Sequence, residues 1–304
     1  QINQIYFTTI RRATPYENKK QIKKLAQNLE ANMLIAFSEK ACENMPTGEF
    51  INIASVNKFL DFNNFKNIDY FMVGSSSIEK SLLNIDIPSE RIRVLPAIIG
   101  EKTGKALSRR DMFIPEKSPI ILASGELLEE NGFDVLFKSL SYLSDVYLLV
   151  DGDGAYRKNL EEYAQKVGIK PRTRFLGYRM DKKNLAELCN LCVAPSKNDT
   201  IGRSILEAFG HKIPLVTVNS PAAQRLVRLD ETGMVVRVDD ALSLANSIKQ
   251  ILENKNDAKQ MVLAAYEFYQ SNFSYDDALK KYKNFLQSVY RKNIKKEYFL
   301  ENVA

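Results

Sequence analysis

Short, continuous apolar runs alternate with amphipathic helical stretches along most of this chain, and that alternation limits its fold more than any other feature. The clearest series lies within residues 119–218, where the runs IILAS, VYLLV, LCVA and PLVTV are separated by helix-like segments. Strands of a parallel sheet that is covered on both faces are apolar throughout, rather than at every second residue. The pattern therefore predicts an α/β fold built from βαβ units.

The alternation occurs in two blocks, and the segment between them lacks it. Residues 98–116 carry glycines, charges and a proline without helical or strand periodicity, as is typical of a linker. A chain of 304 residues also exceeds what one hydrophobic core usually serves. We therefore expect two Rossmann-like, doubly wound domains that face a cleft, the first beginning with a strand at residues 5–10. The expected boundaries are 1–97 for a first domain, 98–116 for a hinge, 117–273 for a second domain, and 274–304 for a C-terminal helix that crosses back to the first domain.

Composition excludes some classes of function. The formal net charge of +6 favours acidic partners such as phosphates, nucleotides or an anionic membrane surface. No nucleic-acid-reading motif is present, so no nucleic-acid partner is expected. No apolar run approaches the ~20 residues that a membrane span needs. The first residues show no secretory leader, and three cysteines without a disulfide framework fit a reducing compartment, so we expect a cytoplasmic protein.

The segment PSKNDTIGRSILEAFG, residues 195–210, combines features of an anion site at the end of an apolar strand. The backbone amides from Ile201 to Ser204 begin a helix, whose positive dipole end suits a phosphate. Gly202 permits a close backbone approach. Asp199 can accept hydroxyl hydrogen bonds, and Glu207 can hold two vicinal hydroxyls such as those of a ribose. The alternative interpretation is that Asp199 is only an N-cap and that Glu207 lies on the surface.

Four other motifs have simpler explanations. VDGDG, residues 150–154, lacks the third glycine of a dinucleotide fingerprint and predicts a turn rather than an NAD site. Cys189 and Cys192 have zinc-like spacing but no second ligand pair, so we interpret them as structural thiols and expect no metal site. His211, the single histidine, is interpreted as a turn residue. Ser75 and its serine neighbours predict a helix cap.

The second block resembles the nucleotide-binding domain of the retaining GT-B glycosyltransferases of family 4. The similar segments follow one another in the family's order: SGELLEENGFDVLFKSL, VDGDGAYRKNLEEYAQKVGI, TRFLGYRMDKKNLAELC, APSKNDTIGRSILEAF with IPLVTVN, and DETGMVVRVDD as a hairpin. In the first block, DYFMVGSSSIEKSLLNIDIPSERIRVLPAII resembles the end of the acceptor domain, and IRRATPYENKKQIKKLA resembles lipopolysaccharide-type members. The resemblance covers nearly the whole chain and implies a GT-B fold.

The resemblance also assigns roles to individual positions. It implies that Asp199 contacts the hydroxyls of the donor sugar and that Glu207 holds the ribose. Tyr178 matches a loop whose backbone contacts the nucleobase. The remaining donor-binding positions that it implies are Gly125, Glu126, Asn131, Gly132, Gly152, Gly154, Arg179, Thr200, Ile201, Gly202, Arg203 and Ser204.

This chain departs from the family pattern where cations should bind the diphosphate. The family pattern G-R-x4-K-G is replaced by Gly125-Glu126 and Asn131-Gly132. Phosphoryl sites depend on preorganised positive charge, and losing one such donor costs about 3–4 kcal/mol of transition-state stabilisation. Arg203 and Arg179 are candidates for compensation. The first domain is also shorter than usual and carries no histidine, although many family members have one near the donor sugar.

The resemblance implies transfer of a hexose from a nucleotide-diphosphate sugar to a lipopolysaccharide-like envelope glycan, with retention of configuration. The nucleotide sugar is a substrate, and neither a cofactor nor a metal is expected. The acceptor would be a glycan or lipid-linked glycan, met by a basic surface of the first domain at the inner face of the membrane. The alternative is a degenerate relative that binds a sugar nucleotide or a partner chain without catalysis.

Overall fold

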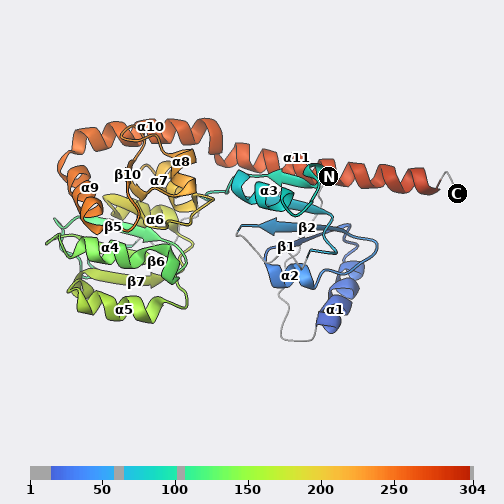
Figure 1. Cartoon of the computed structure of the whole chain (residues 1–304), viewed down its shortest axis with the longest axis horizontal. Helices are drawn as coiled ribbons and strands as arrows, with labels where there is room; N and C mark the ends of the chain where they lie inside the picture. The colour runs from blue at the N-terminus through green and yellow to red at the C-terminus, as the bar shows by residue number, and fades with distance from the viewer. Residues whose placement is uncertain (1–14, 58–64, 101–106, 302–304) are drawn as a thin grey trace. The chain divides into compact units, whose positions relative to one another are not determined.

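The structure is a computed structural model that describes residues 15–57, 65–100 and 107–301. It divides the chain into two compact units, one formed by Gln1–Pro96 with Asp276–Ala304 and the other by Ala97–Tyr275. Each unit is built around one parallel sheet (Figure 1). The expected strand at residues 5–10 lies outside the described residues.

The first unit has a four-stranded sheet in the order β1-β2-β3-β4, with every neighbouring pair parallel. Its strands are β1 (Met33–Ala36), β2 (Ile51–Val56), β3 (Tyr70–Val73) and β4 (Ile92–Val94). Its helices are α1 (Pro15–Asn28), α2 (Glu39–Glu43), α3 (Ser76–Leu83), a 3₁₀ turn η2 (Ser89–Arg91) and most of the long α11 (Tyr275–Glu301).

Helix α11 completes the core of the first unit. Phe285 and Val289 are four residues apart and therefore lie on one face of the helix. Both are buried in a cluster with Ile53 and Met72 from strands β2 and β3. The ring of Phe285 also meets the ring of Tyr70 edge to face, with centroids 6.4 Å apart. The last helix of the chain thus supplies apolar side chains that this sheet needs.

The second unit has a six-stranded parallel sheet in the order β10-β9-β8-β5-β6-β7. The strands are β5 (Ile120–Ser124), β6 (Tyr147–Asp151), β7 (Thr173–Gly177), β8 (Leu191–Ala194), β9 (Leu215–Val218) and β10 (Met234–Val236). The strand order reverses between β5 and β8. In open α/β sheets, ligands bind outside the carboxyl ends of the strands at such a reversal.

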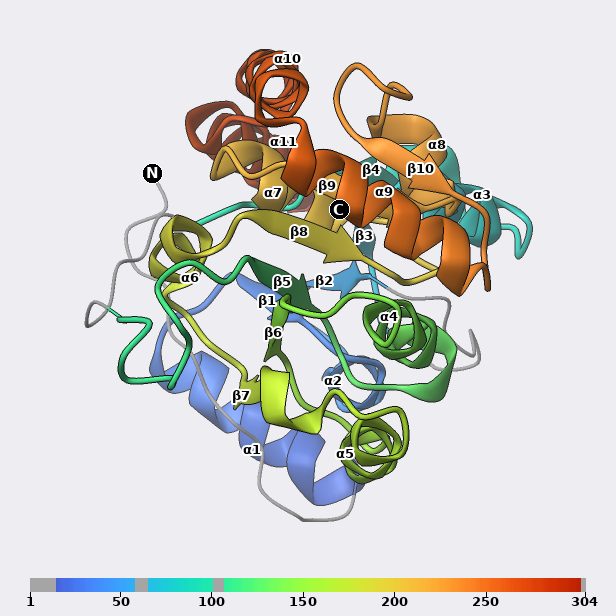
Figure 2. The ribbon, with the colours of Figure 1, turned by 90° about the vertical axis from the view of Figure 1, so that its left-hand side faces the viewer.

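Helices cover both faces of this sheet, which explains why its strands are apolar throughout. Helices α4 (Phe133–Leu140), α5 (Arg157–Lys166) and α9 (Ala241–Glu253) pack on one face, and α6 (Lys182–Leu188), α7 (Arg203–Gly210) and α8 (Pro221–Leu226) on the other. Figure 2 shows α4 and α5 on the side of the sheet opposite to α6 and α7. Helix α10 (Lys255–Phe273) contributes to both cores, and the 3₁₀ turns are η3 (Glu129–Asn131) and η4 (Lys170–Arg172). In β5, Ile121 and Ala123 face one core while Ile120 and Leu122 face the other.

Three segments differ from the sequence expectations. Within the expected linker, Ile99, Met112 and Ile114 are buried in the core of the second unit. The expected hairpin at residues 230–240 is wrong, because β10 pairs in parallel with β9 and thereby extends the sheet. Helix α8 was not expected, because a run as short as PAAQRL has too few turns to show helical periodicity.

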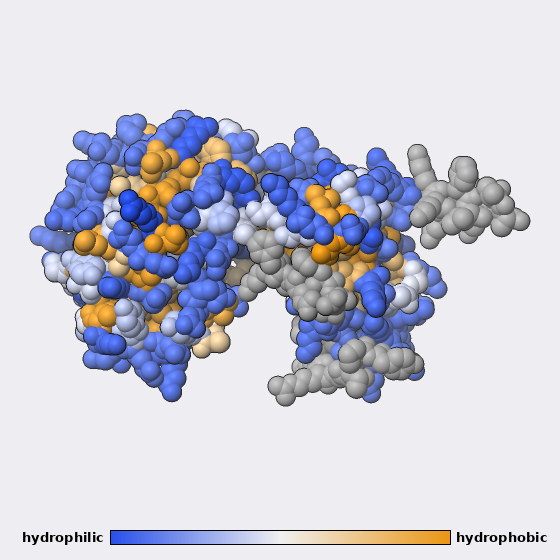
Figure 3. All heavy atoms as spheres, in the orientation of Figure 1, coloured by the Kyte–Doolittle hydropathy of each residue, from blue (hydrophilic) through white to orange (hydrophobic). Residues whose placement is uncertain are grey.

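The surface is mixed in character. Figure 3 shows apolar side chains in separate groups, divided by polar ones, on the face of each unit that is visible there. Single exposed apolar side chains such as Phe113, 84% exposed, are common on folded proteins. Among the helices of the described residues, none is both long and apolar enough to cross a bilayer.

Candidate functional site

Asp199 lies in the loop between β8 and α7 and folds that loop onto itself. Its Oδ1 accepts hydrogen bonds from the backbone N–H groups of Ile201, at 2.9 Å, and Gly202, at 2.8 Å. Burial raises the pKa of Asp199, and these two N–H groups act against that shift. Two of the amides that were expected to hold a phosphate are therefore occupied by Asp199, and the neighbouring Thr200 is buried.

The start of α7 leaves other amides available. The N-cap is Gly202 rather than Asp199, with φ +81° and no side-chain cap. The φ of +81° favours glycine at this position, and a Cβ atom there would lie 2.3 Å from Cδ1 of Leu226, so that side chain would have to shift. Among the described residues, no acceptor meets the amides of Arg203 and Ser204. These two N–H groups at the positive end of the helix dipole form a site suited to an anion.

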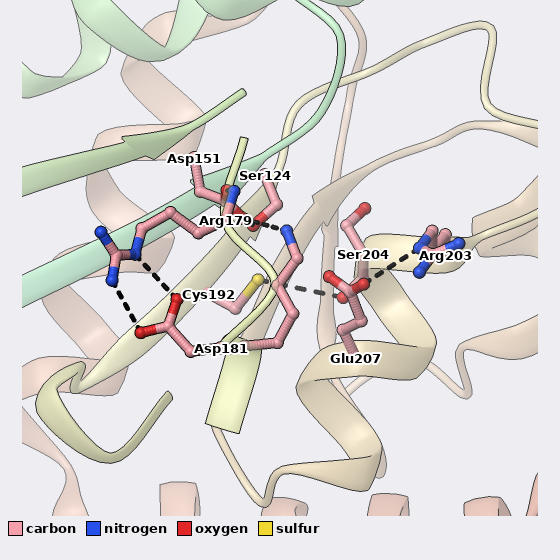
Figure 4. A network of polar contacts seen from close by, with 9 residues as sticks. Ser124, Asp151, Arg179, Asp181, Cys192, Arg203, Ser204 and Glu207 are labelled. Carbon is pink, nitrogen blue, oxygen red and sulfur yellow. Dashed lines mark hydrogen bonds and ion pairs between the residues drawn. The ribbon is translucent and has the colours of Figure 1, made fainter. Parts of the chain in front are cut away.

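Glu207 lies within the protein, one turn further along α7. It is only 8% exposed, so the interpretation of this residue as a surface glutamate is wrong. Its Oε1 accepts a hydrogen bond from Nε of Arg203 at 3.0 Å, as Figure 4 shows. Glu207 also lines a small pocket between α6 and α7, together with Ser204, Lys182 and His211. A carboxylate in such a pocket can accept hydrogen bonds from ligand hydroxyls.

The loop after β5 is joined to the loop after β8. Asn131 donates from Nδ2 to the Glu126 carbonyl at 2.7 Å, and its Oδ1 accepts from Oγ of Ser196 at 3.1 Å. Gly132 has φ +69°, and a Cβ atom there would lie 2.4 Å from the Pro195 carbonyl. Asn131 therefore joins two loops at a position where the family pattern has a cation.

The glycines of the turn after β6 allow two loops to pack closely. A Cβ atom at Gly152 would lie 1.8 Å from the Gly125 carbonyl oxygen, and one at Gly154 would lie 2.3 Å from that of Leu127. The Leu127 amide also donates to the Asp153 carbonyl at 2.9 Å. These contacts give Gly152 and Gly154 a packing role between the turn and the loop that begins at Gly125.

The loop after β7 carries Tyr178 and Arg179. Tyr178 is 66% exposed, and its hydroxyl donates to the Asp153 carbonyl at 3.1 Å. Arg179 forms a two-pronged pair with Asp181 through Nε and Nη2, at 2.8 and 2.7 Å. This pair raises the pKa of Arg179 and lowers that of Asp181. The charge of Arg179 is thus balanced by Asp181, so Arg179 is less suited to replace the missing diphosphate-binding cation.

A buried ion pair lies at the carboxyl end of β6, and the sequence reasoning missed it. The side chain of Asp151 is fully buried and pairs with Nζ of Lys182. The same carboxylate accepts from Oγ of Ser124 and the backbone N–H of Arg179, both at 3.0 Å. Figure 4 shows Ser124, Asp151 and Arg179 in this network, with Ser204 and Glu207 close by. An aspartate directly after the apolar run YLLV was the signal for it.

Arg225 is a second residue that the sequence reasoning missed. It lies on α8, and its Nη2 donates to the Ile201 carbonyl at 2.8 Å. Burial lowers the pKa of Arg225, while Asp199 raises it. No signal in the sequence could have found this residue, because its place depends on how α8 packs against the loop before α7.

The simpler motifs lie in structural positions. Burial raises the pKa of Cys189 to about 12 and also raises that of Cys192, so both are protonated thiols at neutral pH. His211 is the C-cap residue of α7, and its backbone N–H donates to the Glu207 carbonyl at 3.0 Å. The cap prediction for Ser75 is confirmed, since its Oγ accepts from the Ile78 amide at the start of α3.

Comparison with known proteins gives one family match and many relatives. The family model for glycosyl transferases group 1 matches residues 105–268. The lipopolysaccharide core biosynthesis glycosyltransferase LpsE of Rhizobium meliloti is 26% identical over 272 residues, which cover 88% of this chain and 79% of that protein. LpsD of the same organism, named for the same process, is 20% identical over 183 residues, covering 60% of this chain and 53% of LpsD.

Solved structures share the fold. HepE of Anabaena, crystallised with UDP and glucose, superposes with a TM-score of 0.76 at 19% identity and covers 88% of this chain and 81% of its own. Sucrose-phosphate synthase of Thermosynechococcus elongatus gives a TM-score of 0.76 at 19% identity, and the match covers 94% of this chain and 81% of the synthase chain. Together with the two parallel sheets, these neighbours confirm the predicted α/β fold of GT-B type.

Proposed function

Because this chain belongs to the glycosyl transferases group 1 family, we propose that it transfers a hexose from a nucleotide-diphosphate sugar to an envelope glycan, with retention of configuration. The proposal takes its reaction from family membership and its acceptor class from relatives named for lipopolysaccharide core biosynthesis. The donor would bind at the carboxyl edge of the second sheet, where the loops after β5, β6, β7 and β8 meet.

One arrangement carries the proposal. The amides of Arg203 and Ser204, which meet no acceptor among the described residues, lie at the start of α7, and the buried carboxylate of Glu207 lies one turn further along the same helix. A nucleotide-diphosphate sugar has the same order of groups, since the diphosphate is next to the ribose. The amides would hold the diphosphate, and Glu207 would hold the ribose hydroxyls.

In the proposed reaction, the bond between the anomeric carbon and the diphosphate oxygen breaks, and its electron pair leaves with the diphosphate. An acceptor hydroxyl forms the new bond on the same face and gives its proton to the departing diphosphate. Asp199 would orient a hydroxyl of the donor sugar through Oδ2, because the two amides both donate to Oδ1. Helix amides can stabilise the leaving anion, so we propose a reaction that needs no resident metal or cofactor.

The acceptor is proposed to be a glycan or lipid-linked glycan at the inner face of the membrane. The chain has a net charge of +6. Positive charge near an anionic membrane surface contributes about 1 kcal/mol per basic residue. A peripheral, cytoplasmic position would bring the first unit to such an acceptor without a membrane span.

Ligand-dependent thermal unfolding tests the donor site. The full chain is heated with UDP, GDP, ADP, CMP and their sugars, because a ligand that binds only the folded state raises its melting temperature by mass action. We expect one base to stabilise the parent by about 2–3 kcal/mol at a hundred times its dissociation constant. Glu207→Gln should lose most of this shift, while Glu253→Gln, on the exposed end of α9, should keep it. Absence of any shift in the parent contradicts the proposal.

A degenerate binder is the second candidate, and a specific observation favours it. Glu126 places a negative charge where the family pattern has arginine, and Asn131 is held in contacts between two loops. Such a protein would bind a nucleotide sugar without turning it over. Release of free nucleoside diphosphate from the sugar nucleotide that stabilises the parent, measured with and without glycan acceptors, separates the two functions.

A further inference from the structure

The diphosphate end of the proposed site lacks the cations of the family pattern. Glu126 is acidic, and Asn131 is neutral and held by Ser196 and the Glu126 carbonyl at 3.1 and 2.7 Å. Neither residue can neutralise a departing diphosphate. Since stabilisation of an anionic leaving group depends on preorganised positive charge, catalysis at this site requires another cation.

Most cations near the loop before α7 are already paired with carboxylates. Within the part of the chain that the structure describes, these pairs are Arg203 with Glu207, Arg179 with Asp181, Lys182 with Asp151 and Lys197 with Asp239. A carboxylate in direct contact cancels most of the field that a phosphate would feel. These four residues are therefore weak replacements.

Arg225 differs from them because its contact is a neutral carbonyl. Its Nη2 donates to the Ile201 carbonyl at 2.8 Å, and no carboxylate of the described residues lies within ion-pair distance of it. The nearby carboxylate of Asp199 already accepts two backbone hydrogen bonds. Burial of part of the side chain lowers the pKa of Arg225, while the charge of Asp199 raises it. The guanidinium thus lies beside the loop with its direct contact to a carbonyl rather than to a carboxylate, and it is exposed to solvent.

The packing of α8 places this guanidinium near the start of α7. The Ala222 amide on α8 donates to the Asp199 carbonyl at 2.9 Å. The Ser220 side chain caps the helix by accepting from the Ala223 amide at 3.1 Å. Gly202 also packs against Ala222 and Leu226 of α8, since a Cβ atom there would lie 3.2 Å from Cβ of Ala222 and 2.3 Å from Cδ1 of Leu226. Arg225 is therefore carried by a helix that packs directly against the loop before α7 and the start of α7.

We propose that Arg225 binds the diphosphate of the donor and supplies the positive charge that positions 126 and 131 lack. This inference rests on the proposed function and deepens it by naming the cation. The planar guanidinium suits two-pronged contact with phosphate oxygens, and the hydrogen bond from Nη2 to the Ile201 carbonyl orients the group while its other N–H donors remain for the phosphate.

The test compares nucleoside diphosphates with their monophosphates. Isothermal titration of the full chain with UDP, GDP and ADP, and with UMP, GMP and AMP, gives the ratio of the two dissociation constants for the base that binds. In Arg225→Gln we expect this preference for diphosphate to fall by about 10- to 100-fold, the effect of one hydrogen bond to a charged group. Arg225→Lys should lose less of the preference for diphosphate, because lysine keeps the positive charge. An unchanged preference in Arg225→Gln overturns the inference.

Two controls separate this inference from the function it rests on. Arg228→Gln removes the same charge three residues away, where Arg228 pairs with Glu231, and should leave the preference unchanged. Glu207→Gln should weaken diphosphate and monophosphate equally, because it acts at the ribose. If the parent binds none of the six nucleotides, the proposed function itself fails and the inference falls with it. Thermal unfolding without ligand shows that each variant is folded.

Discussion

At the scale of single residues, the pair of Asp151 and Lys182 shows how a charge can be kept inside this fold. Asp151 accepts hydrogen bonds from Ser124 and the Arg179 amide in addition to its ion pair. Removing two charges from water costs several kcal/mol, and attraction between them offsets that cost only when the remaining polar atoms are also satisfied. Here both oxygens of the Asp151 carboxylate have partners, which explains how a charged residue can be buried at the end of β6.

Removing one charge of the Asp151–Lys182 pair should destabilise the protein more than replacing both charged residues with apolar ones. Asp151→Leu leaves the Lys182 ammonium without its partner and should lower the free energy of unfolding by about 3–5 kcal/mol. The double variant Asp151→Leu with Lys182→Met removes both charges and should recover most of that loss. Urea unfolding of the parent, the two single variants and the double variant measures the coupling.

An exposed pair provides the matched control. Lys249 and Glu253 lie four residues apart on α9, with both side chains about 60% exposed. Lys249→Met should change the free energy of unfolding by less than about 1 kcal/mol. Single and double variants at Asp151 and Lys182 that are equally destabilised would show that the two charges do not depend on each other.

At the scale of elements, the candidate site is built by loops that pack backbone against backbone. The turn after β6 meets the loop after β5 at Gly152 and Gly154, and the loop after β5 meets the loop after β8 at Gly132. Glycines at these positions resemble phosphate-binding glycines in sequence. In the structure their missing side chains leave room for neighbouring carbonyl groups, which keeps the loops of the site together.

Two alanine substitutions distinguish this packing from backbone strain. Gly152→Ala would place Cβ 1.8 Å from the Gly125 carbonyl oxygen, so the two loops must move apart. Gly168→Ala meets nothing within 4 Å but must adopt φ +77°. We expect the free energy of unfolding to fall by about 1–2 kcal/mol in Gly168→Ala and by more than about 3 kcal/mol in Gly152→Ala. Chemical denaturation of both variants measures the difference, and equal losses would contradict the packing explanation.

At the scale of the whole molecule, the chain ends in the unit where it begins. Asp276–Ala304 belongs to the same compact unit as Gln1–Pro96, although 179 residues of the second unit separate them. Phe285 and Val289 of α11 supply buried apolar contacts to the sheet of the first unit. The first unit is therefore incomplete without the last helix.

Truncating Phe285 should affect one unit and spare the other. Phe285→Ala removes a ring that is 7% exposed, which should cost about 3–5 kcal/mol in the first unit. Hydrogen exchange followed by mass spectrometry should show faster exchange in β2, β3 and α11 and unchanged exchange in β5 to β9. Leu279→Ala, on the same helix but 47% exposed, should leave both units unchanged within about 0.5 kcal/mol. Faster exchange in β5 to β9 of Phe285→Ala would contradict this division.

The alternation of apolar runs and helices was enough to predict the fold class of this protein. A strand such as β8 is apolar at every residue because each face of its sheet is covered, and that requirement is visible without coordinates. The family resemblance rested on an ordered series of loops, whose spacing the sequence also records. The segment before α7 could likewise be identified as a candidate site, because a strand, a turn and a helix start are local features.

The tertiary structure decided which groups of that site are available. Asp199 occupies two of the amides that the sequence assigned to a phosphate, and Asn131 is held in contacts between two loops. Lys182 and Arg225 come from helices that only packing brings to the loops of the candidate site. Local pattern can predict an element and its exposed or buried faces. It cannot predict which charged side chain from another element will lie beside it, because that depends on contacts between residues far apart in the chain.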